Sequence, residues 1–370
     1  MSTEPAVIKL GNGRNDIVER FNTTLTISCD ELRVDLNRYH ALQTLRVTNF
    51  FGKIQTLNLE TLAPKRTVTR LIIYHAHISQ RMLEIFARIF PNLKELKIFR
   101  CFFNDDVTRV LFPSSLTKLQ IDMSITSSFK NAQIITQLFE YNLRYLQKLY
   151  LNNCFAENGN DDALLANALC HCITLKELVL GDETIHRFCP MHERAFNVVK
   201  LLPSLKRLHA ALGQPNISLS FMYSSLTELS LSNSLISPHQ MAEISKSHHI
   251  EKLNVFIPPS GLQKMDKMYS VRTLTVSLSV DQFDEKEFVT TLSEKMPNLK
   301  IFILARTYII LHNAYTLIRN GILERCPHLT QITTCGNNQS ITLQEETLSL
   351  IRRSYHEMRA FYTSYHIHSL

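Results

Sequence analysis

One six-residue pattern, apolar-x-x-Leu-x-apolar, recurs along most of this chain and constrains its fold more than any other feature. From Val68 onward, successive copies begin 21 to 30 residues apart. Such units each have an apolar face that only neighbouring units cover, so the array must fold as one continuous repeat structure. The copies are LQTLRV (Leu42), IQTLNL (Ile54), VTRLII (Val68), LKELKI (Leu93), LTKLQI (Leu116), LQKLYL (Leu146), LKELVL (Leu175), LKRLHA (Leu205), LTELSL (Leu226), IEKLNV (Ile250), VRTLTV (Val271), LKIFIL (Leu299), LTQITT (Leu329) and MRAFYT (Met358).

Within each copy the apolar residues alternate with other residues, which predicts a short β-strand with one buried face. Between the longer-spaced copies, apolar residues at helical spacing predict helices, and Ser237 followed by Pro238 is a helix start signal. The segments GQPNIS and IPPSGLQKM are expected to form only a turn or a single helical turn. The predicted helical stripes are Met82, Ile85, Phe86, Ile89; Ile134, Ile135, Leu138, Phe139; Leu164, Leu165, Ala168, Leu169; Ala195, Val198, Val199, Leu202; and Leu317, Ile318, Ile322.

These patterns predict an α/β solenoid in the leucine-rich-repeat period range, with about 13 to 14 irregular repeats. Parallel strands are expected on the concave surface and helices on the convex surface. We expect residues 1–39 to be an N-terminal cap or remnant segment. Residues 40–370 are expected to form the solenoid together with its C-terminal cap.

Several phrases that lead into the strands carry a family resemblance. FPNLKELKIFRC, LPSLKRL, MPNLKIF and RCPHLTQI resemble the repeat phrase of F-box and leucine-rich-repeat proteins, whose repeats are of the ribonuclease-inhibitor-like type. The resemblance implies a horseshoe and the substrate-recognition arm of a cullin-type ubiquitin ligase. Residues 1–39 lack the leucine-proline step that opens an F-box, so binding of a ligase adaptor is left open.

Composition narrows the class of protein. The N-terminal residues contain no apolar run of signal-peptide length, and charged residues interrupt the most apolar later stretch, so we expect a cytoplasmic or nuclear protein with no membrane segment. The chain lacks nucleotide-binding, nucleophile-elbow and zinc-protease motifs, so neither an enzyme nor a cofactor is expected. The formal charge of +7 favours an acidic partner, and outside its complex we expect a monomer.

Cysteine-containing motifs were tested by aligning the repeats on their first leucine. Cys172 occupies the position that holds Phe90, Leu202, Met296 and Cys326 in other repeats, which predicts a buried helix end. Cys101 and Cys154 share a position held elsewhere by serine, threonine or asparagine, so we expect them to satisfy backbone groups where the chain leaves the strand.

Two motifs could in principle bind metal. Cys170-His171-Cys172 is interpreted as a helix end, with His171 near the helix C-terminus. The segment from His186 through Cys189 to His192 offers three ligands and lacks an obvious fourth, so a solvated loop is favoured over a zinc site.

Outward strand positions, with the two residues that follow each strand phrase, predict the binding surface. In its first two-thirds these positions are basic and aromatic, interrupted by Glu60, Glu95 and Glu177; in its last third they are apolar. The predicted partner-binding residues are Arg70, Tyr74, Lys97, Phe99, Arg100, Lys118, Lys148, Tyr150, Arg207, His209, Phe256, Ile257, Ile301 and Ile303, with Glu177 and Val179 as additional candidates.

Arginine, tyrosine and phenylalanine are enriched at interface hot spots, so this surface predicts a protein-interaction scaffold that binds an acidic protein. The alternative is a nucleic acid or another acidic ligand bound by the basic and aromatic half. A third view is that exposed lysines and arginines only keep an open sheet in solution. The tail Ser354 to Leu370 is expected either to cover the apolar end or to form the last strand.

Overall fold

The structure is a computed structural model, and it divides the chain into two compact units, Met1–Leu205 and Lys206–Leu370. We call them unit 1 and unit 2 and describe each by itself. The structure describes residues 23–28, 36, 39–48, 63–104, 107, 110–123, 140–152, 154, 162–181, 190–214, 216–221, 225–278, 284–305, 316–335 and 340–353.

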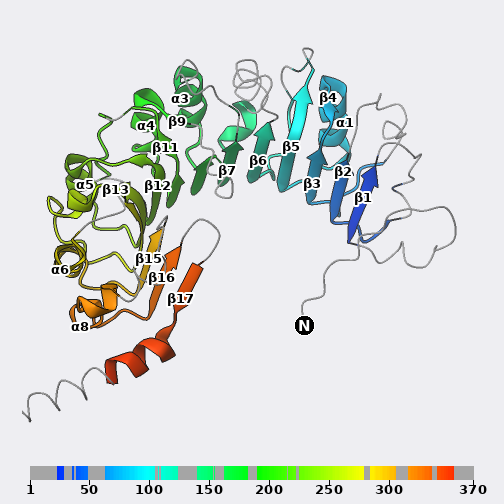
Figure 1. The fold of residues 1–370 in the computed structure, drawn as a ribbon. Helices are drawn as coiled ribbons and strands as arrows, with labels where there is room; N and C mark the ends of the chain where they lie inside the picture. Colours follow the sequence, from blue (N-terminus) through cyan, green and yellow to red (C-terminus); the bar gives the residue numbers. More distant parts are fainter. Residues whose placement is uncertain are drawn as a thin grey trace, which may run out of the picture. The chain divides into compact units, whose positions relative to one another are not determined.

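Unit 1 is built on a parallel sheet in which the strands follow the order β1-β2-β3-β5-β6-β7-β8. The described helices lie on one side of this sheet (Figure 1). Its elements are β1 (Thr24–Ser28), β2 (Thr44–Thr48), β3 (Arg70–Tyr74), β4 (His77–Ile78), α1 (Gln80–Ile89), β5 (Glu95–Phe103), β6 (Lys118–Met123), β7 (Lys148–Asn152), α3 (Asp162–Cys170), β8 (Glu177–Leu180), β9 (Pro190–Met191) and α4 (Glu193–Val199).

Unit 2 continues the same plan, with strands in the order β10-β12-β13-β14-β15-β16-β17; all adjacent pairs are parallel except β16 with β17. A helical segment, residues 345–353, follows the last strand. The elements are β10 (Arg207–His209), β11 (Ala211–Leu212), β12 (Glu228–Leu235), α5 (Pro238–Ser245), β13 (Lys252–Ile257), the 3-10 helix η5 (Pro259–Leu262), β14 (Thr273–Leu278), α6 (Glu285–Lys295), β15 (Ile301–Ala305), α8 (Ile322–Arg325), β16 (Gln331–Cys335) and β17 (Ser340–Leu343).

The six-residue pattern marks the main strands as predicted. Apart from IQTLNL and MRAFYT, every copy begins a β-strand two residues after its first apolar residue. IQTLNL, MRAFYT and the tail Ser354–Leu370 lie outside the described residues. β2 pairs directly with β3 in parallel register, with Thr44 opposite Arg70.

The boundary predicted between residues 39 and 40 falls inside the unit 1 sheet. β1 pairs with β2 in parallel register, Thr24 opposite Thr44, and Leu25 is buried. Alignment on the first leucine missed this strand because the corresponding position is Asn22 rather than an apolar residue. The described part of residues 1–39 therefore extends the sheet.

Helices form where apolar stripes and capping residues coincide. In α1 the four predicted stripe residues are buried, and Ser79 accepts a hydrogen bond from the Met82 amide. In α5 the predicted start is a full capping box between Ser237 and Gln240. Helix α6 was not among the predictions, although Asp284 caps its first turn through the Glu287 amide. The stripe from Ile134 to Phe139 lies outside the described residues.

A recurring turn and a recurring side-chain clasp connect successive repeats. The turn precedes β3, β5, β6, β7, β8, β10, β15 and β16: the Leu93 amide donates to the Phe90 carbonyl at 3.1 Å, and the Leu329 amide to the Cys326 carbonyl at 3.1 Å. The clasp is a hydroxyl one residue before the first leucine; that of Ser115 donates to the Leu93 carbonyl of the preceding repeat at 2.8 Å. Thr174 makes the equivalent bond to Leu146 at 2.9 Å.

The last described repeat is closed by a different group. Arg352, from the helical segment 345–353, donates to the carbonyl oxygens of Cys326 and Leu329 at 3.3 and 2.9 Å. In earlier repeats a hydroxyl of the next repeat satisfies the carbonyl equivalent to that of Leu329, as Ser115 does for Leu93, so Arg352 takes the place of that hydroxyl beside the antiparallel β17. The observed architecture is a mixed α/β fold of repeated, mostly parallel strands. No helix in the described parts of the chain is long and apolar enough to cross a bilayer.

Candidate partner-binding surface

The second and fourth residues of each strand, most of them leucine, isoleucine or valine, face the core. The residues between them face the opposite side of the sheet, which we call the non-core face. It consists of the first, third and fifth residues of each strand, because side chains alternate along a β-strand. In unit 1 this face carries Arg70, Ile72 and Tyr74 from β3; Glu95, Lys97 and Phe99 from β5; Lys118, Gln120 and Asp122 from β6; Lys148, Tyr150 and Asn152 from β7; and Glu177 and Val179 from β8.

Glu95 is the centre of the charge distribution on the unit 1 face. Its carboxylate forms ion pairs with Arg70 on β3, with Lys97 at 3.3 Å on its own strand, and with Lys118 on β6 at 2.9 Å. Burial by itself raises the carboxyl pKa, but the hydrogen bond from Lys118 and the three positive charges outweigh burial and hold the Glu95 pKa below its ordinary value. One carboxylate is thus surrounded by three cations, which leaves an excess of positive charge around it.

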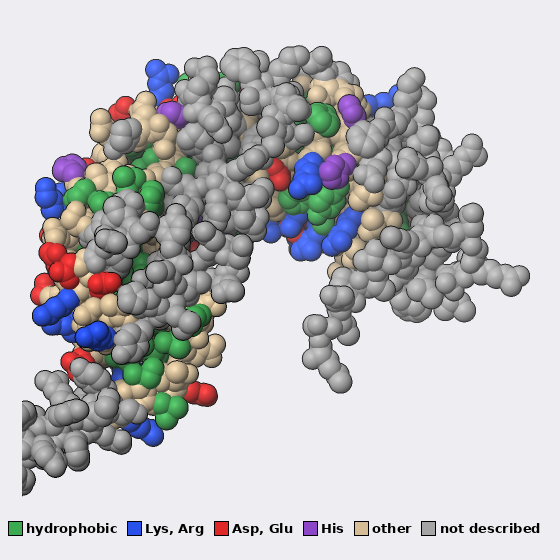
Figure 2. Space-filling view, viewed as in Figure 1, with side chains coloured by type: hydrophobic (Ala, Val, Ile, Leu, Met, Phe, Trp, Pro, Cys, Tyr) green, Lys and Arg blue, Asp and Glu red, His purple; other side chains and the backbone are tan. Residues whose placement is uncertain are grey.

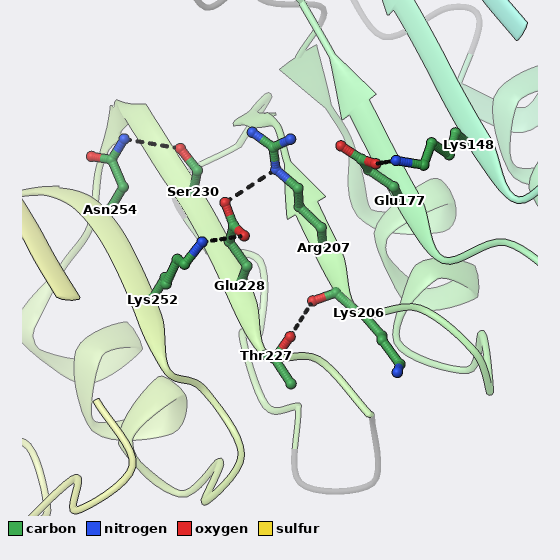
Figure 3. Close-up of polar contacts among 9 residues, drawn as sticks. All are labelled: Lys148, Glu177, Lys206, Arg207, Thr227, Glu228, Ser230, Lys252 and Asn254. Atoms are coloured by element: carbon green, nitrogen blue, oxygen red, sulfur yellow. Dashed lines mark hydrogen bonds and ion pairs between the residues drawn. The ribbon is translucent and has the colours of Figure 1, made fainter. Parts of the chain in front are cut away.

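The first strand position forms a ladder of ion pairs in both units. In unit 1, Lys148 contacts Glu177 at 2.9 Å; in unit 2, Glu228 lies between Arg207 at 3.1 Å and Lys252 at 3.4 Å (Figure 3). The predicted basic surface is therefore partly neutralised by glutamates on neighbouring strands.

Aromatic side chains lie beside the charges of unit 1. The rings of Tyr74 and Phe99 are stacked with centroids 4.9 Å apart, and the Lys118 ammonium lies 5.4 Å from the centroid of the Tyr150 ring. In the space-filling view, Lys and Arg side chains gather near β3 and β5 (Figure 2). The structure thus brings the predicted residues of β3 to β7 together on one face.

The chain leaves this face through a bulge at Arg100. Arg100 has φ of 50°, its side chain is exposed, and the register of β5 against β6 shifts around it. His75 takes the same left-handed conformation, φ of 48°, at the equivalent position after β3. The predicted residue Arg100 is therefore accessible, but at a bulge beyond the regular alternation of the strand.

The non-core face of unit 2 is largely neutral beyond Lys252. From β14 to β16 it carries threonine, serine, glutamine and the predicted Ile301 and Ile303, which are partly exposed. Phe256 on β13 is also partly exposed, two residues after Asn254, whose side-chain amide donates to the Ser230 hydroxyl on β12 at 3.0 Å. The polar side chains of β14 thus separate Phe256 from Ile301 and Ile303, which are neighbours on β15.

Two predicted partner-binding residues are wrong because their side chains are buried. Ile257 is 0% exposed: the alternation of β13 continues through it onto the core face, and the Gly261 backbone packs against its side chain. His209 is 5% exposed, and its register partner Ser230 is also buried. Alternation along a strand determines on which side of the sheet a side chain lies. Its exposure also depends on how far the side chains of neighbouring strands extend over it.

The additional candidates Glu177 and Val179 are likewise buried, at 8% and 4% exposure, so neither presents a side chain to a partner. Glu177 is folded against Lys148 in its ion pair. Val179 stands opposite the much longer Tyr150 on β7, and a side chain that short does not rise above its neighbours.

The cysteines lie where repeat alignment predicted. Cys101 and Cys154 are buried, and each thiol contacts the carbonyl two residues back and a carbonyl of an earlier strand, Ile73 and Ile121, both at 3.6 Å. Cys172 is buried like Phe90, Leu202, Met296 and Cys326, and burial raises its pKa to about 12.

The two metal candidates have different outcomes. Cys170 is exposed while Cys172 is buried, so the two thiols do not face a common centre. His186 and Cys189 lie outside the described residues, and His192 is the N-cap residue of α4. Among the residues that the structure describes, no group of three or more His, Cys, Asp or Glu side chains is placed to hold a metal ion.

Sequence reasoning missed the pairing of charges across strands. Read down the first strand position, unit 1 has Arg70, Glu95, Lys118, Lys148 and Glu177, and unit 2 has Arg207, Glu228 and Lys252. The signal was present in the repeat alignment, but glutamates were read as interruptions rather than as partners. A scan against protein-family models finds no match for this chain, and a search of curated proteins finds no significant match.

Proposed function

We propose that this chain is a protein-interaction scaffold and that the non-core face of unit 1 binds an acidic segment of a partner protein. The observation that carries the proposal is the excess of cations around Glu95, where Arg70, Lys97 and Lys118 share one carboxylate. The stacked Tyr74 and Phe99 add an aromatic contact area on the same strands. Complementary charge steers association and aromatic anchors supply affinity.

The fold proposal that goes with it is a leucine-rich-repeat horseshoe, with the non-core face as its concave side. Support comes from the recurring strand phrase, the turn that recurs before many of the strands, and the parallel register. The resemblance to F-box and leucine-rich-repeat proteins extends the proposal to the substrate-recognition arm of a cullin-type ubiquitin ligase. That extension rests on the resemblance alone, and recovery of a cullin-type adaptor with the purified chain is its test.

Nucleic-acid binding is the weaker candidate. A backbone of phosphates favours a continuous row of cations, whereas Glu95 and Glu177 interrupt the first strand position of unit 1. Titration of the purified chain with single-stranded RNA at rising salt separates the two. Steeply salt-dependent RNA binding would replace the protein-binding proposal.

The test of the proposed function is capture of partners by tagged chain with two matched sets of charge reversals. The test set, Lys97→Glu, Arg100→Glu and Lys148→Glu, lies on or beside the unit 1 face. The control set, Lys246→Glu, Lys264→Glu and Lys286→Glu, makes the same charge change at exposed residues in or near helices of unit 2. We expect the test set to fold and lose its partners while the control set keeps them; equal capture by both sets would contradict the proposal.

A further inference from the structure

We propose that Lys118 and Lys148 together form the binding point for a carboxylate of the acidic segment, with the Tyr74–Phe99 stack receiving an apolar side chain of the same segment. This inference rests on the proposed function. It names the part of the unit 1 face that recognises the partner, and it states the chemistry that the partner must present.

The charge ladder at the first strand position has one exception. Among the described strands of both units, Lys118 and Lys148 are the one pair of neighbouring first positions that carry like charges. Adjacent strands lie about 4.8 Å apart, so the two stems start close together. Like charges directly opposite each other across strands are unfavourable unless an anion compensates them.

The two ammonium groups are directed to opposite sides. Lys118 pairs with Glu95 on β5, whereas Lys148 pairs with Glu177 on β8. The carboxylates that pair with these two lysines therefore lie on the outer neighbouring strands, β5 and β8, and not between β6 and β7, where the Tyr150 ring lies beside Lys118. An ammonium group has three donors, so each lysine can keep its glutamate and still bind an incoming carboxylate.

Both lysines are accessible to a partner. The side chain of Lys118 is 30% exposed and that of Lys148 is 50% exposed, while the glutamates they contact are nearly buried. An acidic segment would meet the ammonium groups rather than the carboxylates. Charge complementarity at this point therefore favours a negative occupant.

The distance to the aromatic stack sets the spacing of the partner's side chains. Tyr74 and Phe99 are four residues further along their strands than the first position, and β3 and β5 lie about two strands from β6 and β7. Strand geometry places the two points about 16 Å apart, the span of about 5 extended residues. The predicted ligand is an extended segment with an acidic and an aromatic or large aliphatic residue about 5 positions apart.

Unit 2 offers a built-in control. There Glu228 occupies the position between Arg207 and Lys252, so the site for an added carboxylate is already filled by the chain itself. A charge reversal at Lys252 tests the general effect of charge on the non-core face without touching the proposed point.

The experiment selects random twelve-residue peptides from a display library on the full-length chain. Binding of the enriched peptides is then measured for the double variant Lys118→Glu/Lys148→Glu and for Lys252→Glu. We expect enriched peptides with an aspartate or glutamate four to six residues from an aromatic or large aliphatic residue. The double variant should bind them at least about 10-fold more weakly, and Lys252→Glu should bind within about 2-fold of wild type.

The outcomes separate this inference from the proposed function. Acidic peptides that bind the double variant as well as wild type would overturn the assignment to Lys118 and Lys148, while the protein-binding proposal would stand. Enrichment of basic or uncharged peptides, or no enrichment, would overturn both. RNA binding that is lost in the double variant, without peptide enrichment, would assign the point to a phosphate backbone instead.

Discussion

The leucine faces of the two units are alike, whereas their non-core faces differ. In unit 1, Leu71, Leu96 and Leu119 are fully buried at the same strand position that Leu229 and Leu274 occupy in unit 2. On the other side of the sheet, unit 1 combines a cation cluster with a stacked aromatic pair. Among the residues described, the non-core face of unit 2 carries charged side chains from β10 to β13 and uncharged side chains from β14 to β16.

This difference shows which positions the fold constrains. Core positions must fill the space between strands and helices, so they tolerate little change in volume. Non-core positions tolerate any side chain that satisfies its own charge or polarity, so a bias there reflects function or solubility. The bias of unit 1 toward cations and aromatic rings is the basis of the proposed function.

The largest effect is expected from the buried leucines that the two units have in common. Leu119→Ala in unit 1 and Leu274→Ala in unit 2 remove side chains that are 0% exposed at equivalent positions. Each should lower the free energy of unfolding by about 2 to 5 kcal/mol, measured by urea denaturation. Thr273→Ala, on the non-core face, is the control and should stay within about 0.5 kcal/mol. A loss below 1 kcal/mol in only one unit, on that same scale, would show that the two cores are not equivalent.

The variants Glu95→Gln and Glu228→Gln compare how much the ion pairs on the two non-core faces contribute to stability. Glu95 is nearly buried among three cations, so its loss should cost about 1 to 2 kcal/mol at neutral pH. Glu228 has a side chain that is 30% exposed, so its loss should cost less than about 1 kcal/mol. Equal losses of unfolding free energy in the two variants would show that the three cations around Glu95 add no more stability than the two around Glu228.

The same variant predicts a pH dependence. Because the Glu95 pKa is below its ordinary value of 4.5, its stabilisation is fully present above that pH and is lost as pH falls through the lowered pKa. Wild type should therefore lose more unfolding free energy than Glu95→Gln when the solution is acidified below pH 4.5. Parallel pH profiles for the two proteins would rule out this contribution.

A smaller loss of unfolding free energy is expected when the aspartates that cap helices in the two units are removed. In unit 1, Asp162 at the start of α3 accepts hydrogen bonds from the amides of Arg194 and Ala195 in α4, at 2.9 and 3.2 Å, so one repeat caps the helix of another. In unit 2, Asp284 caps its own helix through the Glu287 amide. We expect Asp162→Ala and Asp284→Ala each to cost about 1 kcal/mol by thermal or urea unfolding. Amide exchange in α4 should accelerate only in the Asp162 variant, and unchanged exchange would refute the cap between repeats.

The smallest effect should be the same in both units. Burial raises the pKa of Cys172 in unit 1 to about 12 and that of Cys326 in unit 2 to about 11. Both thiols should therefore react with iodoacetamide at pH 8 at least about 10-fold more slowly than the exposed Cys170, as followed by peptide mass spectrometry. Rapid labelling of either one would show that the helix end at its repeat opens readily.

The strand positions could be predicted from the sequence because the period of the leucines encodes both the element and its buried side. The same alignment placed Cys172 and Cys101 without any structural information. Where an apolar marker is missing, as at Asn22, the pattern alone misses a strand. Pairing to the neighbouring strand reveals it.

The binding surface was harder to predict than the fold. The side of the sheet is a local property of each strand, and the residues of β3 to β7 were placed on it correctly. Exposure depends on neighbours that are 20 to 30 residues away in sequence, which is why His209 and Val179 were misjudged. The paired state of Lys118 and Lys148 depends on strand register, which a single repeat does not contain.

The central claim is that unit 1, through the lysines of its non-core face, contacts carboxylates of a partner. Carbodiimide cross-linking of the captured complex tests it directly, because this reagent joins a lysine to a carboxylate in contact with it. The chain's own pairs, Lys118 with Glu95 and Lys148 with Glu177, both at 2.9 Å, serve as internal positive controls. We predict links from Lys97, Lys118 or Lys148 to aspartate or glutamate of the partner and none from Lys252. Partner links confined to unit 2, or to the helices of unit 1, would contradict the account.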